Sequence, residues 1–366
     1  MVEVQAKRTP VYPAYKDSGK IVDFAGWALP VIFKGIKEEH LAVRERVGIF
    51  DTSHMGEVRV TGPDALAFCQ RIFCNDLSKI PNGKAQYGEL LNPEAGIIDD
   101  LIAYRMGDSE IFFCVNAANT DKDFKWITSQ KTPADNVKIV NQSPDYAQIA
   151  VQGPKAVNVI NKLLPGLGDR VGGFFFAQET LLGEPAIIAR TGYTGEDGFE
   201  IFFPAAGGVK LWNALLETGK SEGIEPCGLG CRDTLRLEVA YPLHGHDISE
   251  DTTPLEAGLG WTLGWNKEFI GKAKLATQKN LGVQKKRVGL EMVDRGVARD
   301  GYPVKVGGKV VGKITSGTKT PCLDKAIAMA YVVTEFSKID QELMVEIRGE
   351  DKKAKIVKMP FYKKTK

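Results

Sequence analysis

The sequence predicts a fold of the α+β class, and three observations lead to this prediction. Strand-like and amphipathic helical segments alternate along the chain to about residue 265. After the 272–286 stretch the character changes, and strand-like segments dominate to the end. The chain has 366 residues, which is too long for one ordinary hydrophobic core, so we expect two or three packed units.

A repeated pattern of strand, Gly-Pro turn and helix organises the first part of the chain. It occurs at residues 58–72, around Gly62-Pro63, and again at 147–164, around Gly153-Pro154. An amphipathic helix is expected before the first copy, at 35–47, where apolar residues recur at helical spacing. The two copies point to an internal structural duplication.

Other short segments complete the expected elements. Strands are predicted at 86–91, 97–104, 111–115, 187–189 and 199–203, and helices at 209–217 and 232–239. Near the C-terminus, a Gly-Gly turn at Gly307-Gly308 predicts a hairpin over 304–311. Further strands at 326–333, 343–348 and 354–357 make the last ~80 residues a small β-barrel or sandwich.

Composition and charge argue against several classes of protein. Hydrophobic residues make up 43% of the chain and charged residues 26%, which is typical of soluble globular proteins. No apolar run approaches the ~20 residues of a membrane-spanning helix. The 48 basic and 46 acidic residues give a net charge of +2, which argues against a dedicated nucleic-acid binder. The first ten residues resemble neither a signal nor a transit peptide, so we expect a cytoplasmic or mature mitochondrial matrix protein.

Two adjacent carboxylates, Asp99 and Asp100, interrupt one of the apolar strand segments. Neighbouring residues on a strand point to opposite faces, so one carboxylate can face a cavity while the other faces solvent or a backbone amide. Burial would disfavour ionisation of the inner carboxylate, which could then orient an amine or accept its proton. A structural carboxylate at a turn or strand edge is the alternative.

A Gly-rich segment at 190–200 connects two predicted strands, and its three glycines permit close approach of a ligand. It lacks the Gly-Lys-Ser/Thr ending of a phosphate loop. Glu200 lies between large apolar neighbours and needs a partner, which a flat heterocycle with adjacent N–H donors could supply. Tyr193 could pack on such a ring. A surface hairpin with an exposed glutamate remains the alternative.

Arg232 is predicted in the first turn of a helix, where the helix dipole disfavours a cation. Such an arginine is expected to hold a carboxylate or carbonyl group of a ligand, unless Asp233 or Glu238 pairs with it. The six cysteines lack the spacing of metal ligands and are expected to be reduced and mostly buried, with no metal site. A hydrolytic triad involving His54 is disfavoured, because the chain has no Gly-x-Ser-x-Gly elbow.

Taken together, these motifs resemble the aminomethyltransferase (T-protein) family of the glycine cleavage system. Each motif is weak by itself, but their order and spacing extend over nearly the whole chain. The matching segments are 22–27, 50–56, 96–101, 115–119, 190–200, 228–238 and 314–317.

The resemblance implies a three-domain cloverleaf around a central folate channel. A first folate-binding domain would be assembled from residues 1–50 plus 140–265, a second α+β domain would span 51–139, and a C-terminal β-barrel would span 285–366. A monomer is the default expectation, because no coiled-coil pattern is visible.

The resemblance also implies the reaction. The aminomethyl group on the lipoyl arm of H-protein passes to tetrahydrofolate, the co-substrate, which releases ammonia and forms methylenetetrahydrofolate without a metal. Asp100 is similar to the family's catalytic carboxylate and Glu200 to its pterin-binding glutamate. The other implied folate-site residues are Met55, Tyr87, Asn116, Tyr193, Arg232 and Tyr241.

Two other functions and one partner surface are alternatives that the sequence raises. A related folate-dependent demethylating oxidase would need a flavin, but no G-x-G-x-x-G fingerprint follows an N-terminal strand. A non-catalytic or repair-type folate-binding protein would carry a Lys-Gly-Cys-Tyr-x-Gly-Gln-Glu signature, which is missing. The segment 352–366 has seven lysines and no carboxylate side chain, so it forms either a solvated face or a dock for the acidic H-protein.

Overall fold

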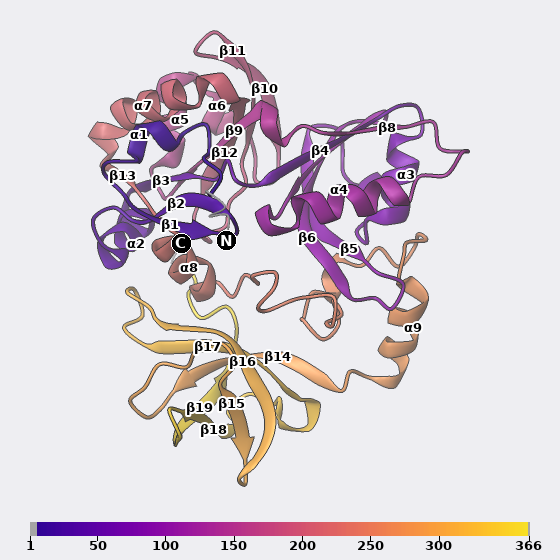
Figure 1. Cartoon of the computed structure of the whole chain (residues 1–366), viewed down its shortest axis with the longest axis vertical. Helices are drawn as coiled ribbons and strands as arrows, with labels where there is room; N and C mark the ends of the chain where they lie inside the picture. Colours follow the sequence, from indigo (N-terminus) through magenta and orange to yellow (C-terminus); the bar gives the residue numbers. More distant parts are fainter. Residues whose placement is uncertain (1–5, 365–366) are drawn as a thin grey trace, which may run out of the picture. The chain divides into compact units, whose positions relative to one another are not determined.

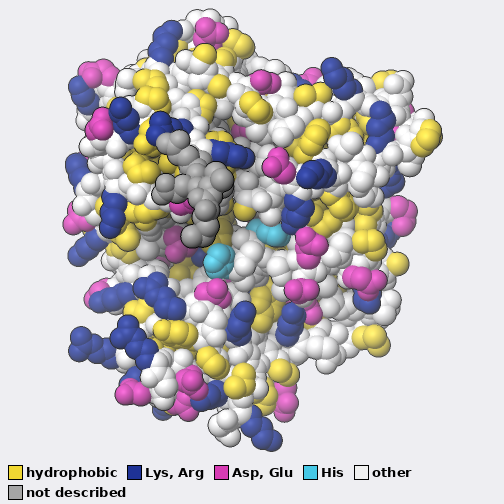
Figure 2. Space-filling view, viewed as in Figure 1, with side chains coloured by type: hydrophobic (Ala, Val, Ile, Leu, Met, Phe, Trp, Pro, Cys, Tyr) yellow, Lys and Arg dark blue, Asp and Glu magenta, His cyan; other side chains and the backbone are white. Residues whose placement is uncertain are grey.

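The computed structural model describes residues 6–364, which form two compact units (Figure 1). The first unit runs to Ile72 and adds Asp76–Gly88 and Leu101–Arg232. The second comprises Phe73–Asn75, Glu89–Asp100 and the chain from Asp233 onward. Among the described residues, no helix is long and apolar enough to cross a membrane. On the face shown in Figure 2, acidic and basic side chains are interspersed, in keeping with the small net charge.

A six-stranded sheet with one layer of helices forms much of the first unit. Its strand order is β10-β11-β12-β9-β3-β13, and every neighbouring pair is antiparallel except β13 with β3. The strands are β3 (Val47–Asp51), β9 (Tyr146–Gln152), β10 (Phe176–Leu181), β11 (Glu184–Ala189), β12 (Gly198–Pro204) and β13 (Ile224–Pro226). Alternate residues of β9 and β12 enter one core with α5 and α7, as strand periodicity requires.

Helices and a hairpin accompany this sheet. The helices are α1 (Tyr12–Tyr15), α2 (Ile36–Glu45), α5 (Ala156–Leu163), α6 (Leu167–Arg170) and α7 (Gly208–Gly219), and the hairpin pairs β1 (Lys20–Phe24) with β2 (Trp27–Ile32). The helix predicted at 35–47 is therefore present, although it ends earlier because Val47 begins β3.

A five-stranded sheet has the order β5-β6-β7-β4-β8. Its strands are β4 (Gly56–Thr61), β5 (Lys84–Leu91), β6 (Ile97–Gly107), β7 (Glu110–Val115) and β8 (Lys138–Asn141), with helices α3 (Ala65–Ile72) and α4 (Thr120–Ser129). Within the first unit, an aromatic cluster joins this sheet to the six-stranded one. At its centre, the rings of Phe112 on β7 and Phe202 on β12 meet edge to face, with centroids 5.3 Å apart.

The predicted duplication is visible in the backbone. Gly62 follows β4 and Gly153 follows β9, with φ angles of 131° and 135°, values that residues other than glycine rarely adopt. The carbonyl of each glycine accepts a hydrogen bond from the backbone nitrogen three residues later, at 3.0 Å in both cases. The same strand, turn and helix therefore occur twice.

The C-terminal strands form a closed barrel in the order β14-β17-β16-β15-β18-β19, so the barrel and not the sandwich is correct. The strands are β14 (Lys285–Met292), β15 (Pro303–Val306), β16 (Lys309–Lys319), β17 (Ala326–Val333), β18 (Glu342–Ile347) and β19 (Glu350–Val357). Ring closure comes from β14, which pairs with both β17 and β19. The Gly307-Gly308 turn joins β15 to β16 with positive φ at both glycines, as predicted.

The lysine-rich segment at 352–366 begins within β19, a strand of the barrel. Lys352, Lys353 and Lys355 belong to β19, and each forms an ion pair, with Glu350, Glu342 and Asp340 in turn. Lys366 lies outside the described residues. Two further helices, α8 (Leu229–Glu238) and α9 (Lys272–Leu281), precede the barrel.

Candidate functional site

Glu200 lies on β12, an interior strand whose neighbours are β11 and β9. Its side chain is half-buried, so the exposed-hairpin alternative is wrong. Glu200 Oε1 accepts a hydrogen bond from Gln148 Nε2 at 3.2 Å, and Oε2 accepts one from Thr191 Oγ1 at 2.7 Å. Two donors on one carboxyl group suit an ionised carboxylate, which retains further lone pairs for a ligand.

A buried thiol extends this network. Cys114 Sγ donates to Gln148 Oε1 at 3.6 Å. Burial raises the pKa of Cys114 well above its usual range, and the nearby Glu57 and Glu200 carboxylates raise it further, while Arg232 opposes them. The thiol therefore stays protonated, and Cys114 acts as a hydrogen-bond donor and not as a nucleophile.

The Gly-rich loop between β11 and β12 is fixed by buried polar contacts. Arg44 on α2 donates from Nη1 to the carbonyl of Thr194 at 2.7 Å and to Glu196 Oε1 at 3.0 Å. The side chains of Arg44 and Glu196 are almost fully buried. At the base of the loop, Arg190 and Asp197 form an ion pair. The loop is therefore a rigid element of the fold.

Gln152 fixes the same loop from β9. Its Nε2 donates to the carbonyl of Thr191 at 3.1 Å, and its Oε1 accepts from Thr194 Oγ1 at 2.9 Å. A Cβ on Gly192 would stand 2.0 Å from Gln152 Oε1, so this close approach requires glycine. The backbone on both sides of Tyr193 is thereby held in place.

Arg232 lies over the ring of Tyr193, with its guanidinium carbon 4.9 Å from the ring centroid. Within residues 6–364 its guanidinium forms no salt bridge, and Asp233 pairs with Arg236 instead. The expected structural pairing of Arg232 with Asp233 or Glu238 is therefore wrong. A cation held by an aromatic ring remains available to an anionic or carbonyl group of a ligand.

His54 and Met55 follow β3 in a turn. Asp51 accepts hydrogen bonds from Thr9 at 2.6 Å, Tyr15 at 2.7 Å and the backbone of Ser53 at 2.9 Å, so its carboxylate serves structure and no hydrolytic triad forms. Burial and the Arg232 charge lower the pKa of His54 to about 3. Met55 is half-buried against the aromatic cluster that contains Cys114.

The first unit also contains Tyr87, half-buried on β5, and Asn116, half-buried directly after β7. The carbonyl of Asn116 accepts a hydrogen bond from the backbone of Asn119 at 2.9 Å, which begins a short helical turn. Six of the predicted folate-site residues thus belong to this unit. The contacts described above group Met55, Tyr193, Glu200 and Arg232 around Cys114.

Asp99 and Asp100 belong to the second unit, on β6. Both are buried, with exposed fractions of 0% and 8%. Neither carboxylate therefore faces solvent, which was one of the two surroundings expected for the second carboxylate. His244 Nδ1 lies 4.0 Å from Asp99 Oδ1, and His244 Nε2 lies 3.1 Å from the carbonyl oxygen of Ile97. Asp100 points to the opposite face of the strand.

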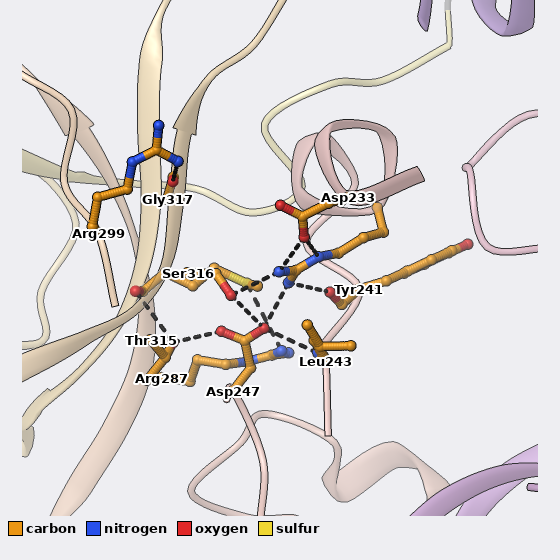
Figure 3. Close-up of polar contacts among 11 residues, drawn as sticks. Asp233, Tyr241, Leu243, Asp247, Arg287, Arg299, Thr315, Ser316 and Gly317 are labelled. Carbon is orange, nitrogen blue, oxygen red and sulfur yellow. Dashed lines mark hydrogen bonds and ion pairs between the residues drawn. The ribbon is translucent and has the colours of Figure 1, made fainter. Parts of the chain in front are cut away.

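Tyr241, the remaining predicted residue, is positioned by a buried ion pair (Figure 3). Arg236 Nη1 donates to Asp247 Oδ2 at 2.6 Å and to the carbonyl of Tyr241 at 3.3 Å. Asp247 Oδ2 also accepts from Ser316 Oγ on β16 at 2.8 Å and from the backbone of Leu243 at 3.0 Å. Sequence reasoning missed Asp247, because its partners lie 4 to 69 residues away and no local pattern marks it.

The six cysteines are free, five of them buried and Cys322 exposed, as expected for a reduced protein. Burial raises the pKa of Cys69, Cys74 and Cys231 well above the usual range. These thiols therefore act as small core residues.

Known proteins resemble the chain over its length. The family model for the GCVT N-terminal domain matches residues 13–267, and the glycine cleavage T-protein C-terminal barrel domain matches residues 285–363. The aminomethyltransferase of Geobacillus sp. (strain WCH70) is 47% identical over 98% of this chain and 100% of its own length. That of Bacillus mycoides (strain KBAB4) is 46% identical over 99% of this chain and 100% of its own length.

A solved structure also matches the fold. The glycine cleavage system aminomethyltransferase T from Bartonella henselae superposes with a TM-score of 0.90 at 33% identity, over 97% of this chain and 98% of its own. The α+β class with a C-terminal barrel is thereby confirmed.

Proposed function

We propose a function from one premise: this chain belongs to the aminomethyltransferase (T-protein) family of the glycine cleavage system. The chain is an aminomethyltransferase, and that family uses tetrahydrofolate as a substrate. On this premise, the chain transfers the one-carbon unit of the aminomethyl-lipoyl arm of H-protein to tetrahydrofolate. The products are ammonia, methylenetetrahydrofolate and the dihydrolipoyl arm.

Glu200 carries the proposal for folate. Its carboxylate is held by Gln148 and Thr191 on an interior strand and keeps lone pairs for further donors. The pterin edge offers such donors, a ring N–H beside an amino group. Tyr193 and Arg232 would contact the same ligand by stacking and by a charge-assisted hydrogen bond. Met55, Tyr87, Asn116 and Tyr241 are proposed to complete the folate site.

Asp100 is proposed as the catalytic carboxylate. One nitrogen of tetrahydrofolate attacks the aminomethyl carbon as the carbon–sulfur bond to the lipoyl arm breaks, and its proton goes to the released thiolate. A second folate nitrogen then attacks the same carbon, which closes the methylene bridge, and its proton leaves with the amine as ammonia. The buried Asp100 carboxylate would orient the attacking nitrogen and take part in its proton transfer. Most of the rate would come from holding the two reactants together, and the scheme needs no metal.

The alternatives are a catalytically inactive or repair-type folate-binding protein of the same fold. Two observations favour the transferase: the chain is 46–47% identical to aminomethyltransferases over nearly its whole length, and it has both Asp99 and Asp100. Folate binding alone does not separate these alternatives, because a catalytically inactive relative could still bind folate.

The decisive test measures ammonia release from aminomethylated H-protein with and without tetrahydrofolate, for the native chain and Asp100→Asn. Folate-dependent release that falls by at least ~100-fold in the variant is expected for a general acid-base and orienting group. Unchanged release in the variant would assign catalysis to another residue. Folate binding without any release would favour the binding-protein alternative.

The lipoylated H-protein is the proposed partner, and the lysines after β19 are its proposed dock. Lys352, Lys353 and Lys355 already pair with carboxylates on the barrel, so a truncation that tests the dock should begin after Val357. Unchanged affinity for H-protein after this truncation would refute the dock. The bacterial relatives support a cytoplasmic location over the matrix of a mitochondrion.

A further inference from the structure

Glu57 is a buried acid that the proposed function leaves unexplained. It lies on β4, its exposed fraction is 1%, and no cation pairs with it among residues 6–364. Its Oε2 atom is buried and has no hydrogen-bond partner within the described part of the chain. Buried polar atoms are almost always hydrogen-bonded, so such an atom calls for a ligand or an ordered water.

The register of the strands shows which way Glu57 points. Glu57 is directly opposite Cys114 on the neighbouring strand β7, and residues opposite each other share one face of a sheet. Phe112, two residues before Cys114, is on this face too and meets Phe202 of the other sheet. Glu57 therefore faces the layer between the two sheets of the first unit.

Glu200 faces the same layer from the opposite sheet. It lies two residues before Phe202 on β12, and residues two apart on a strand share a face. Both Glu57 and Glu200 lie near enough to raise the pKa of the buried Cys114 thiol and that of the buried Tyr104 hydroxyl. The two carboxyl groups thus border one common space.

Their surroundings give the two acids different states. Glu200 accepts two hydrogen bonds, which suits the ionised form. Glu57 Oε2 receives none from the described residues, and burial raises the pKa of Glu57 well above its usual range, which favours the neutral carboxylic acid with an O–H to donate. An acceptor and a donor of the same chemical type therefore face the same layer between the two sheets.

We propose that Glu57 is a second ligand-binding acid of this site, and that it donates its O–H to the ring carbonyl of a bound lactam. A pterin presents an amino group, a ring N–H and a carbonyl oxygen in a row along one edge. Glu200 would accept from the two donors, and Glu57 would donate to the carbonyl. This inference rests on the proposed folate function, and it makes Glu57 a determinant of specificity for 4-oxo over 4-amino pterins.

The experiment compares equilibrium binding of tetrahydrofolate and 4-amino-4-deoxytetrahydrofolate to the full chain under anaerobic conditions. Glu57→Leu removes the donor and Glu57→Gln keeps one in the same place. One neutral hydrogen bond corresponds to roughly 2- to 10-fold in affinity. We expect Glu57→Leu to weaken tetrahydrofolate binding by about that factor and to lose the preference over the 4-amino analogue, while Glu57→Gln keeps most of both.

Glu89→Gln is the matched control, since Glu89 is also a buried acid beside a cysteine, Cys74, but lies in the second unit. It should leave the preference unchanged. A Glu57→Leu chain that keeps the native preference, whatever its melting temperature, overturns the inference and leaves the folate function standing. Failure of the native chain to bind tetrahydrofolate would instead refute the proposed function, and the inference with it.

Discussion

The ion pair between Arg236 and Asp247 offers a sharp test of the packing beneath Tyr241. The two side chains are 3% and 0% exposed, so Asp247 is a fully buried carboxylate partner of Arg236. Asp247→Asn keeps the shape of the side chain but removes its charge. Breaking one partner of a buried pair typically costs ~3–5 kcal/mol, because the other charge stays buried without compensation.

The loss should be near the lower end of that range. Arg236 keeps its second carboxylate, Asp233, whose side chain is 52% exposed, and asparagine can still accept from Ser316 and the backbone of Leu243. We therefore expect a decrease of ~3 kcal/mol in the free energy of unfolding. For a cooperative unit of 150–250 residues this corresponds to a fall of roughly 6–12 °C in Tm.

Differential scanning calorimetry resolves the transition of this unit, and Asp233→Asn is the control on the same arginine. An exposed pair contributes about 0–1 kcal/mol, so the control should shift Tm by no more than ~4 °C. Because Arg236 also donates to the carbonyl of Tyr241, the Asp247 variant should raise the KM for tetrahydrofolate. Equal, small shifts in Tm for both variants would refute the assignment of Asp247 as the buried anchor.

Three further predictions concern single polar groups. Burial raises the pKa of Glu89 to about 7, above its unfolded value of ~4.3, so ionisation of native Glu89 lowers stability progressively between pH ~4.3 and 7 and by a constant amount above pH 7. By urea unfolding, Glu89→Gln should therefore be more stable than the native chain by up to ~4 kcal/mol at pH 8 but by little at pH 4, and an equal difference at both pH values would contradict this. The pKa of His54 is lowered to about 3, so its imidazole signals in NMR spectra should not titrate between pH 5 and 9, and a midpoint near 6.5 would show that the ring is not buried as described. Gln152→Leu removes two hydrogen bonds that hold the loop around Tyr193, which should lower the free energy of unfolding by ~1–3 kcal/mol. It should also weaken folate binding more than it alters turnover, and unchanged binding would show that Gln152 does not position Tyr193.

The sequence predicted those features whose cause is local. Two Gly-Pro turns and one Gly-Gly turn were found because the backbone there needs unusual φ angles that few residues adopt. Alternation of apolar residues located most strands of the mixed sheets. It did not locate β14, since Lys285–Met292 mixes charged and apolar residues without a clear period, and this strand closes the barrel.

Burial depends on partners distant in the sequence, and prediction was weaker there. From their alternation, one of Asp99 and Asp100 could be expected to face solvent, yet both are buried. Glu57 lies beside Val58 in what looks like an ordinary half-exposed strand, and only the second sheet makes it a core residue. The roles of Met55, Tyr87, Asn116, Tyr193, Arg232 and Tyr241 stay predictions that rest on family resemblance.

The groups around Glu200 show why a crowded polar site can hold a single anion. Burial holds the His54 imidazole, the Cys114 thiol, the Tyr104 hydroxyl and the Glu57 carboxyl in their neutral forms, since it disfavours whichever form is charged. The charges left in the first unit's site are then those of Glu200, which two donors hold, and Arg232, which Tyr193 holds. Such a site presents a ligand with one hydrogen-bonded carboxyl group and one guanidinium group among neutral polar groups.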